Sequence, residues 1–350
     1  MQKMIQIKNH TIEKYHSPFI ISEAGLNHNG ELEKAFRMIE IAKEAGSDAI
    51  KFQTYTATDF ISEPNQTYTY HSQGNEITES MIDMFERCEF TTNEWFEIKK
   101  KCEDEKIIFL STPVNPSDLE FLIKLGVPAV KIGSSDLTNL PLLKSCKDTG
   151  LPILLSCGMA STKEISESLK ILGSPEKIPV VLLVCTSEYP TPTSDVNLLR
   201  FQTFSELFPD VPLGFSDHTQ GTLASSLAIA MGSCVFEKHF TLDHNLPGPD
   251  HWFSEDPTGL KQWIESIRLS FKMMGSSMIK PTLAETEMKK IARKSIVALE
   301  DISKGEVLGK KIGAKRPGYG LSPTLISEIT NKKSNKTIKK NSLLKLEDFE

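Results

Sequence analysis

The stretch that decides the fold spans residues 19–53 and reads FIISEAGLNHNGELEKAFRMIEIAKEAGSDAIKFQ. It contains two short apolar runs, Phe19 to Glu23 and Ala49 to Gln53, which have the length and composition of buried strands. Between them, Leu32 to Ala45 carries apolar residues at helical spacing. The stretch therefore predicts one strand–helix–strand unit.

The same alternation continues along the chain. Six further strand-like runs follow, namely Ile107 to Thr112, Ala129 to Ser134, Pro152 to Gly158, Val180 to Ser187, Leu213 to His218 and Cys234 to Phe240. Eight strand–helix units in about 250 residues predict an α/β fold of the (β/α)8 TIM-barrel type, with its active site at the carboxyl ends of the strands. A doubly wound open sheet is the alternative, but the turn from Gly25 to Gly30 lacks the three-glycine dinucleotide fingerprint.

The chain of 350 residues is longer than such a barrel requires. We expect a barrel domain over residues 1–280, preceded by a hairpin within residues 1–17, then a linker over 281–292 and a small β-rich domain over 293–350. The polar, tyrosine-rich segment from Ile61 to Ile77 is interpreted as an inserted loop over the strand ends, either a lid or a tolerated surface insertion.

The composition is that of an ordinary globular protein, with 39% hydrophobic and 25% charged residues. No apolar run is long enough to cross a membrane, and the first residues lack the apolar core of a signal peptide. We therefore expect a soluble, cytoplasmic protein without a membrane partner. Six cysteines occur without any Cys-x-x-Cys pair, which argues against a disulfide framework or a zinc ribbon.

Charge is distributed unevenly along the chain. From residue 281 onward, 15 Lys and Arg stand against 9 Asp and Glu, a net charge of +6, whereas the first 280 residues carry −12. A solvated basic surface and docking of the basic part on an acidic one both explain this difference. A nucleic-acid partner is not expected, because apolar residues continue through the basic part.

Strand phase predicts which polar side chains face the inside of the barrel, because alternate residues of a barrel strand point inward. Lys51, Lys131 and Ser156 share the inward phase of their strands, and Thr112 and Ser216 lie at the ends of theirs. Ammonium and hydroxyl groups gathered in this way suit a phosphate. One such lysine alone is equally well explained as a salt-bridged barrel residue.

Two histidines are predicted to meet at the ends of neighbouring strands. His218 and His239 end the seventh and eighth runs, and two imidazoles there suit one divalent cation. Glu23, which ends the first run, is a candidate for proton transfer or for hydroxyl binding, with a simple ion pair to Lys51 as the alternative. The loop of Pro247 to His251 is expected to present Asp250 and His251 close to the histidines.

Taken together, these motifs resemble the sialic acid synthase family over essentially the whole chain. The segments that carry the resemblance are Ser22 to Gly30, Lys51 to Gln53, Ser111 to Pro113, Lys131 to Ser134, Ser156 to Met159, Cys185 to Pro192, Gly214 to Thr219, Glu237 to Thr241, Pro247 to His251 and Lys315 to Gly318. The tail resembles the antifreeze-like (SAF) domain that such enzymes carry after their barrel.

The resemblance implies a transferase that condenses phosphoenolpyruvate with an N-acylated hexosamine and water. N-acetylmannosamine is the expected sugar, which makes the expected activity that of an N-acetylneuraminate synthase in sialic acid biosynthesis. A legionaminate synthase acting on 2,4-diacetamido-2,4,6-trideoxymannose, and then a pseudaminate synthase, are the alternatives. A metal-dependent aldolase on the same barrel is the alternative from another class.

The resemblance also implies roles for individual residues and a homodimer. The residues assigned to phosphoenolpyruvate are Lys51, Thr112, Lys131, Ser156 and Ser216, with Ser134 in the same substrate-binding set. Those assigned to the sugar are Glu23, Gln53, Tyr189 and Asp250. The metal is assigned to His218 and His239. Mn²⁺ is the expected ion, with Mg²⁺ or Co²⁺ as alternatives. In a domain-swapped homodimer, Arg316 is expected to reach the partner subunit's site and contact the N-acyl group.

Overall fold

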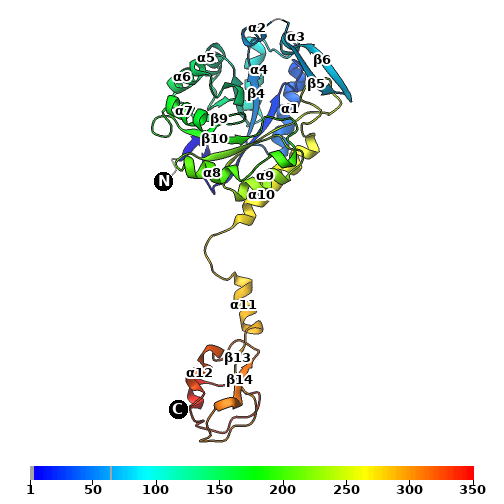
Figure 1. Cartoon of the computed structure of the whole chain (residues 1–350). Helices are drawn as coiled ribbons and strands as arrows, with labels where there is room; N and C mark the ends of the chain where they lie inside the picture. The colour runs from blue at the N-terminus through cyan, green and yellow to red at the C-terminus, as the bar shows by residue number, and fades with distance from the viewer. Residues whose placement is uncertain (1–3, 64) are drawn as a thin grey trace. The chain divides into compact units, whose positions relative to one another are not determined.

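The computed structural model describes residues 4–63 and 65–350, so Met1 to Lys3 of the predicted hairpin and Pro64 of the predicted inserted loop lie outside the described residues. The chain divides into two compact units, Met1–Gly275 and Ser276–Glu350. In the first unit, helices surround a central sheet (Figure 1).

The first unit is a (β/α)8 barrel, as predicted. Its eight strands are all parallel and pair in the order β7-β4-β3-β12-β11-β10-β9-β8, with β7 and β8 beside each other, so that the circle nearly closes. The strands are β3 (Phe19–Gly25), β4 (Ala49–Thr54), β7 (Ile108–Pro113), β8 (Val130–Ile132), β9 (Ile153–Ser156), β10 (Val180–Cys185), β11 (Leu213–Asp217) and β12 (Val235–His239).

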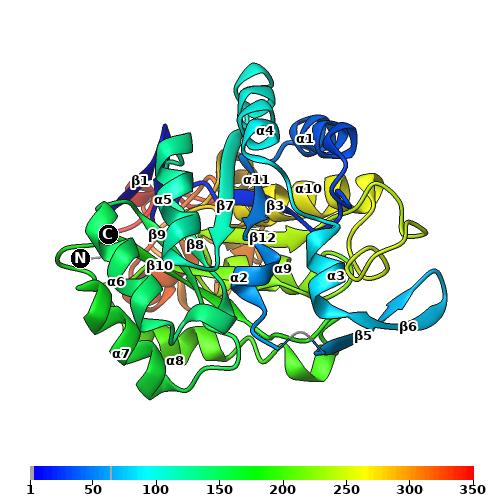
Figure 2. The ribbon, with the colours of Figure 1, turned by 90° about the horizontal axis from the view of Figure 1, so that it is seen from above.

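One main helix follows each strand, and Figure 2 shows several of these helices in succession around the strands. They are α1 (Leu32–Ala45), α4 (Thr92–Asp104), α5 (Pro116–Leu125), α6 (Leu140–Thr149), α7 (Thr162–Leu172), α8 (Arg200–Leu207), α9 (Leu223–Ala230) and α10 (Pro257–Met274). Local signals set the helix ends. Ser161 forms a capping box with Glu164 before α7, and Gly173 ends that helix with a φ of 74°.

Most buried apolar side chains of the barrel belong to two separate cores, which follow the predicted strand phase. Ile50, Phe52 and Leu155 belong to the outer core, between the strands and the helices. Ala49 and Leu154, which alternate with them, belong to the inner core. Inward and outward positions are therefore as the sequence predicts, and this alternation determines which polar groups reach the barrel mouth.

A hairpin closes the amino-terminal end of the barrel. Strands β1 (Ile5–Ile7) and β2 (His10–Ile12) pair antiparallel, and Ile5, Ile7 and Ile12 pack with inner-core residues such as Phe19 and Val235. Phe19 and Val235 are the first residues of their strands. The barrel interior is consequently filled at this end, which leaves the carboxyl ends of the strands for a site.

The segment after β4 is more ordered than the predicted loop. It contains the short helices α2 (Ala57–Phe60) and α3 (Met81–Glu86) and an antiparallel hairpin of β5 (Thr67–Ser72) and β6 (Asn75–Ser80). Gln73 and Gly74 at its turn have φ angles of 51° and 78°, as in the two-residue turns that suit hairpins. The expectation of an irregular loop was wrong, because this turn and the flanking Thr and Tyr residues favour paired strands.

The second unit has its own small core. Strands β13 (Ser295–Ala298) and β14 (Ile312–Lys315) pair antiparallel, and with the short helix α12 (Ile326–Ile329) they surround a cluster that includes Ile296, Leu308 and Phe349. Helix α11 (Leu283–Ala292) occupies most of the segment expected to be a linker, and none of its residues is buried. The second unit thus contains a small two-stranded sheet, and its chain begins with a helix.

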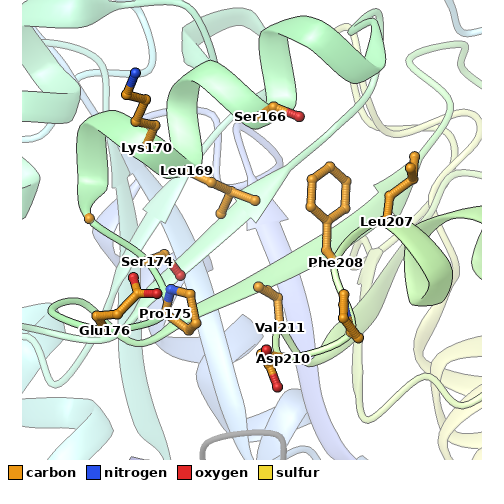
Figure 3. Close-up of a pocket in the computed structure, with 12 residues that line it drawn as sticks. Ser166, Leu169, Lys170, Ser174, Pro175, Glu176, Leu207, Phe208, Asp210 and Val211 are labelled. Atoms are coloured by element: carbon orange, nitrogen blue, oxygen red, sulfur yellow. The ribbon is translucent and has the colours of Figure 1, made fainter.

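A cleft of about 410 Å³ lies between α7 and α8, beside the segments that lead into β10 and β11 (Figure 3). Leu169, Phe208 and Val211 line it. Because it adjoins the amino ends of these strands, it is not the mouth at which barrel enzymes carry their active sites.

All six cysteines are free and buried. Within the described residues, no helix is long and apolar enough to span a membrane.

We expect Ile7→Ala to destabilise the barrel, because Ile7 is fully buried in the inner core. Removing a buried Ile side chain leaves a cavity and should lower the free energy of unfolding by about 2–5 kcal/mol. The matched control is Ile123→Ala on α5, where the side chain is 41% exposed and the change should stay within about 0.5 kcal/mol. Urea unfolding followed by circular dichroism measures both, and equal stability of the two variants would contradict the role of the hairpin.

Candidate active site

Polar side chains replace the apolar inner core toward the carboxyl ends of the barrel strands. Every barrel strand except β10 contributes at least one of the predicted residues: Glu23 from β3, Lys51 and Gln53 from β4, Thr112 from β7, Lys131 from β8, Ser156 from β9, Ser216 from β11 and His239 from β12. His218 directly follows β11. Inward alternation brings these residues from distant parts of the chain to one end of the barrel.

Two lysines are held by two carboxylates at the centre of this end. Lys51 Nζ lies 2.6 Å from Glu23 Oε2 and 3.7 Å from Glu237 Oε2, and Lys131 Nζ lies 3.6 Å from Glu237 Oε1. All four side chains are buried. Because a buried charge is costly unless it is paired, Glu237 between the two ammonium groups helps both to remain charged.

The two carboxylates differ in acidity. Burial raises the pKa of Glu23 to about 7, and the opposing effect of Lys51 does not cancel this. Burial would also raise the pKa of Glu237, but Lys131 and Lys51 lower it to about 2. Burial lowers the pKa of Lys51, but Glu23 and Glu237 raise it by more, so that it lies above its ordinary value. Glu237 therefore stays ionised, whereas Glu23 can take up or release a proton near neutral pH.

Hydroxyl groups surround the lysines. Thr112 Oγ1 accepts a hydrogen bond of 3.0 Å from Lys51 Nζ, and Ser216 Oγ donates one of 3.0 Å to Glu237 Oε1. Ser156 Oγ is buried and has no hydrogen-bond partner among the described residues. A buried polar group is normally satisfied, so this hydroxyl is suited to an added ligand.

Two histidines lie next to this cluster, with ring centroids 5.7 Å apart. His218 Nδ1 is 2.7 Å from the carbonyl oxygen of Thr186, so Nδ1 carries a proton, and Nε2 lies 3.4 Å from Ser216 Oγ. His239 Nδ1 is buried, has no hydrogen-bond partner in the described parts of the chain and lies 3.8 Å from Asp250 Oδ2. Burial and His218 hold the pKa of His239 well below its ordinary value, so this imidazole is neutral.

These donors fit a divalent transition-metal ion in an open site. Two imidazole nitrogens are typical ligands of such an ion, and the Asp250 carboxylate oxygen Oδ2 lies 3.8 Å from His239 Nδ1. Within residues 4–63 and 65–350, no group of three or more His, Cys, Asp or Glu is arranged to hold a metal by itself. If the two imidazoles bound such an ion, its other coordination positions would fall to water or substrate.

An aromatic wall borders the histidines on the outer side of the site. The ring of Tyr189 lies 4.1 Å from that of His218 and 5.2 Å from that of Phe253, measured between centroids. Tyr189 is 43% exposed, in contrast to the buried lysines. It therefore meets solvent at the mouth and suits contact with a larger second substrate.

Two residues belong to the site although no sequence motif pointed to their role. Glu237 bridges both lysines, and its inward phase, shared with His239, is the signal that could have identified it. Cys185 ends β10, with Sγ 3.8 Å from both His218 Nδ1 and Ser134 Oγ. Its alternation with the outward-facing Val184 places it inside the barrel, which only the strand phase could have indicated.

Comparison with known proteins assigns the family. A family model described as the NeuB family matches residues 38–279, and one described as the SAF domain matches residues 293–350. The chain belongs to the NeuB family. The predicted resemblance is thereby confirmed, as is the SAF type of the second unit.

Relatives in the NeuB family match nearly the full chain. An uncharacterized protein of Methanocaldococcus jannaschii is 42% identical over 330 residues, covering 94% of each chain. An N,N'-diacetyllegionaminic acid synthase of Campylobacter jejuni is 39% identical over 332 residues, covering 93% of this chain and 98% of the relative. The crystal structure of N-acetylneuraminic acid (sialic acid) synthetase from Leptospira borgpetersenii serovar Hardjo-bovis in complex with citrate has a TM-score of 0.74 and 34% identity, and covers 82% of this chain and 95% of that one.

The remaining predicted residues of this NeuB-family chain differ in their surroundings. Gln53 Nε2 donates to Glu23 Oε1 at 3.5 Å, and burial raises the pKa of Asp250 to about 6. His251, in contrast, faces away from the metal donors and contacts Thr241 and Asn29. Arg316 lies in the second unit, exposed directly after β14, so its role toward a partner subunit stays a prediction.

A second ion pair lies behind the two histidines, on the outward faces of the same strands. Asp217 and Lys238 are register partners on β11 and β12, and Lys238 Nζ lies 3.1 Å from Asp217 Oδ2. The hydroxyl of Ser225 on α9 donates to the same carboxylate oxygen at 2.6 Å. Each partner directly precedes one of the histidines, so this pair fixes the strand ends from which His218 and His239 project.

We expect Lys238→Met to destabilise the barrel, because it leaves the fully buried Asp217 carboxylate without its cation. Breaking a buried pair in this way should lower the free energy of unfolding by about 3–5 kcal/mol. Lys163→Met is the matched control, since the pair of Lys163 with Glu167 is 3.9 Å long and exposed, and its loss should cost less than about 1 kcal/mol. Chemical denaturation compares the two; a Lys238→Met variant as stable as the control would show that the pair does not fix the strand ends.

Proposed function

We propose that the protein condenses phosphoenolpyruvate with an N-acylated hexosamine and water, and releases a nonulosonic acid and phosphate. Membership of the NeuB family, a family of phosphoenolpyruvate-dependent nonulosonic acid synthases, supports this proposal. The observation that carries it is the pair of buried inward lysines, Lys51 and Lys131, beside the unpartnered hydroxyl of Ser156 on the next strand. Such a set suits a small, highly charged anion.

Phosphoenolpyruvate is proposed to bind at the lysines with both of its anionic groups. The ammonium groups of Lys51 and Lys131 supply charge, and the hydroxyls of Ser156, Thr112 and Ser216 supply hydrogen bonds. Ser134 Oγ, which accepts a hydrogen bond of 3.0 Å from the amide of Gly158, is proposed to contribute at the edge of the same region. A ligand with several negative charges would replace the carboxylates as partner of the lysines.

The proposed reaction joins C3 of phosphoenolpyruvate to the aldehyde carbon of the open-chain sugar. When bound, a divalent cation supplies Lewis acidity that polarises the aldehyde oxygen. Glu23, with a pKa of about 7, delivers the proton that this oxygen needs to become a hydroxyl. Water then adds at the cationic C2 and gives one proton back to Glu23. The C2 hydroxyl gives its remaining proton to the leaving phosphate as the bond between C2 and the phosphate oxygen breaks, which leaves the 2-keto group. Mn²⁺ is the proposed ion, with Mg²⁺ and Co²⁺ as alternatives.

The sugar is proposed to lie between Tyr189, Asp250 and Gln53. N-acetylmannosamine is the first candidate, which would make the enzyme an N-acetylneuraminate synthase. The second candidate is 2,4-diacetamido-2,4,6-trideoxymannose. It is supported by the sequence identity of 39% to a legionaminic acid synthase, which is higher than the 34% to the N-acetylneuraminic acid synthetase. Related sugars differ by a few pocket contacts, so direct comparison of substrates is needed to separate them.

We expect phosphate release from phosphoenolpyruvate that depends on the sugar and stops when a chelator is added. The purified chain is assayed with Mn²⁺ and each of three sugars: N-acetylmannosamine and the diacetamido sugars used by legionaminate and pseudaminate synthases. Lys131→Met should reduce kcat/KM for phosphoenolpyruvate by roughly 30-fold or more, because a buried charged contact is lost. Lys163→Met should leave it unchanged.

Failure of all three sugars to give chelator-sensitive phosphate release would refute the proposal. Cleavage of a nonulosonic acid to pyruvate, unaffected by Lys131→Met, would instead support a metal-dependent aldolase, which needs the histidines but not the lysines.

We further propose a homodimer in which Arg316 of one subunit completes the barrel site of the other. The acidic first part of the chain and the basic second part have complementary charge, which supports this arrangement. Arg316 is exposed and therefore free to contact another chain. Arg316→Ala should raise the KM for the sugar and leave the unfolding transition unchanged.

Mixed dimers show whether Arg316 acts on the active site of the partner subunit or on that of its own chain. Lys51→Met inactivates a barrel but leaves Arg316 intact, so co-expression with Arg316→Ala should restore about one quarter of wild-type activity if the arginine acts on the partner. Activity no higher than that of the two separate variants would show that Arg316 does not act between subunits.

A further inference from the structure

The β5–β6 hairpin is an addition to the barrel unit that follows β4, and the proposed chemistry gives it no role. At its base, Arg87 forms two hydrogen bonds of 2.6 and 2.8 Å with Glu79. Both strands are fully described, and within them Ser72 alone is buried. A tolerated surface insertion has no reason to bury a residue next to its tip, so the contacts of Ser72 indicate what the hairpin does.

The tip of the hairpin binds the loop that carries Asp250. Ser72 Oγ accepts a hydrogen bond of 3.2 Å from the amide of Gly248, and Gln73 Nε2 donates one of 2.8 Å to the carbonyl oxygen of Asn245. The ring of His71 packs edge-on against Trp252 at 5.2 Å between centroids. Three consecutive residues of the hairpin thus hold the loop over residues 245–252. Figure 2 shows the hairpin at the rim of the barrel.

The barrel itself holds this loop on both sides of Gly248. His251 contacts Thr241 Oγ1 at 2.6 Å and Asn29 Oδ1 at 3.1 Å. Asn29 also donates to the carbonyl oxygen of Pro247 at 2.9 Å. The amide of Gly248, whose φ of 143° suits few other residues, is held by the hairpin. Asp250 lies between these two sets of contacts, so its position depends on both.

We propose that Ser72 and Gln73 are positioning residues that hold the loop so that Asp250 faces the sugar. This inference rests on the proposed function, in which Asp250 lines the sugar site. The phosphoenolpyruvate residues lie on barrel strands and make no described contact with the hairpin tip. Loss of these contacts should therefore weaken sugar binding and leave phosphoenolpyruvate binding unchanged.

The test compares steady-state kinetics of Ser72→Ala with a conservative and a control variant. Ser72→Ala removes the acceptor for the Gly248 amide and should raise the KM for the sugar about fivefold, the effect of one lost hydrogen bond. The KM for phosphoenolpyruvate at saturating sugar should not change. Ser72→Thr keeps the hydroxyl and should restore the sugar KM. Thr69→Ala removes an exposed hydroxyl pair with Thr78 on the same hairpin and should have no effect.

Gln73→Asn is a second, independent change, because it shortens the side chain while Asn tolerates the positive φ of this turn position. It should raise the sugar KM in the same direction. An unchanged sugar KM in both Ser72→Ala and Gln73→Asn would overturn the proposal, and so would an equal rise in both KM values, which would indicate a general loss of structure.

Amide hydrogen exchange tests, without any enzymatic assay, whether Ser72 and Gln73 hold the loop over residues 245–252. Peptides covering residues 245–252 should exchange faster in Ser72→Ala than in wild type or Thr69→Ala. If the protein lacks synthase activity but Ser72→Ala still exchanges faster, the proposed function is refuted and the contact between hairpin and loop is supported. Unchanged exchange in Ser72→Ala would overturn the proposal that the hairpin holds the loop, whatever the activity.

Discussion

The structure depends on the need to keep two lysine ammonium groups charged inside the mouth of a barrel. Lys51 and Lys131 are buried, and each meets a carboxylate within 4 Å. Either lysine alone would be expensive to bury. Glu237 lies close to both, and Glu23 adds a second acid whose pKa is near neutrality. The result is a site in which positive charge is maintained for an anion while one proton remains exchangeable.

The fold and much of the site follow from sequence periodicity. Alternation within the strands predicts that Lys51, Lys131 and Ser156 point inward, and the two separate apolar cores confirm the phase on which this depends. Helix α1 agrees with its predicted bounds, Leu32 to Ala45, and Gly46 in the left-handed conformation marks its end. These are local signals, and they can be interpreted without knowing which parts of the chain meet.

Other features depend on contacts between distant segments. The hairpin of β5 and β6 was expected to be a loop, because its strands are polar and lack the apolar alternation of a buried strand. Glu237 lies in a segment that carries the family resemblance, but its contact with both lysines becomes visible only when β4, β8 and β12 are assembled into one barrel. Arg316 illustrates a further limit, since the partner that it is predicted to serve would belong to another chain.

The hairpin at the amino end of the barrel determines where substrates enter and products leave. Ile5, Ile7 and Ile12 fill that end, so the mouth at the carboxyl ends is the way in for a substrate. The lysines there are buried, whereas Tyr189 stands at the outer edge and is 43% exposed. For the proposed reaction, two substrates would occupy this passage one behind the other. The inner substrate must then enter before the outer one, and the phosphate formed at the inner position can leave only after the sugar acid has moved aside.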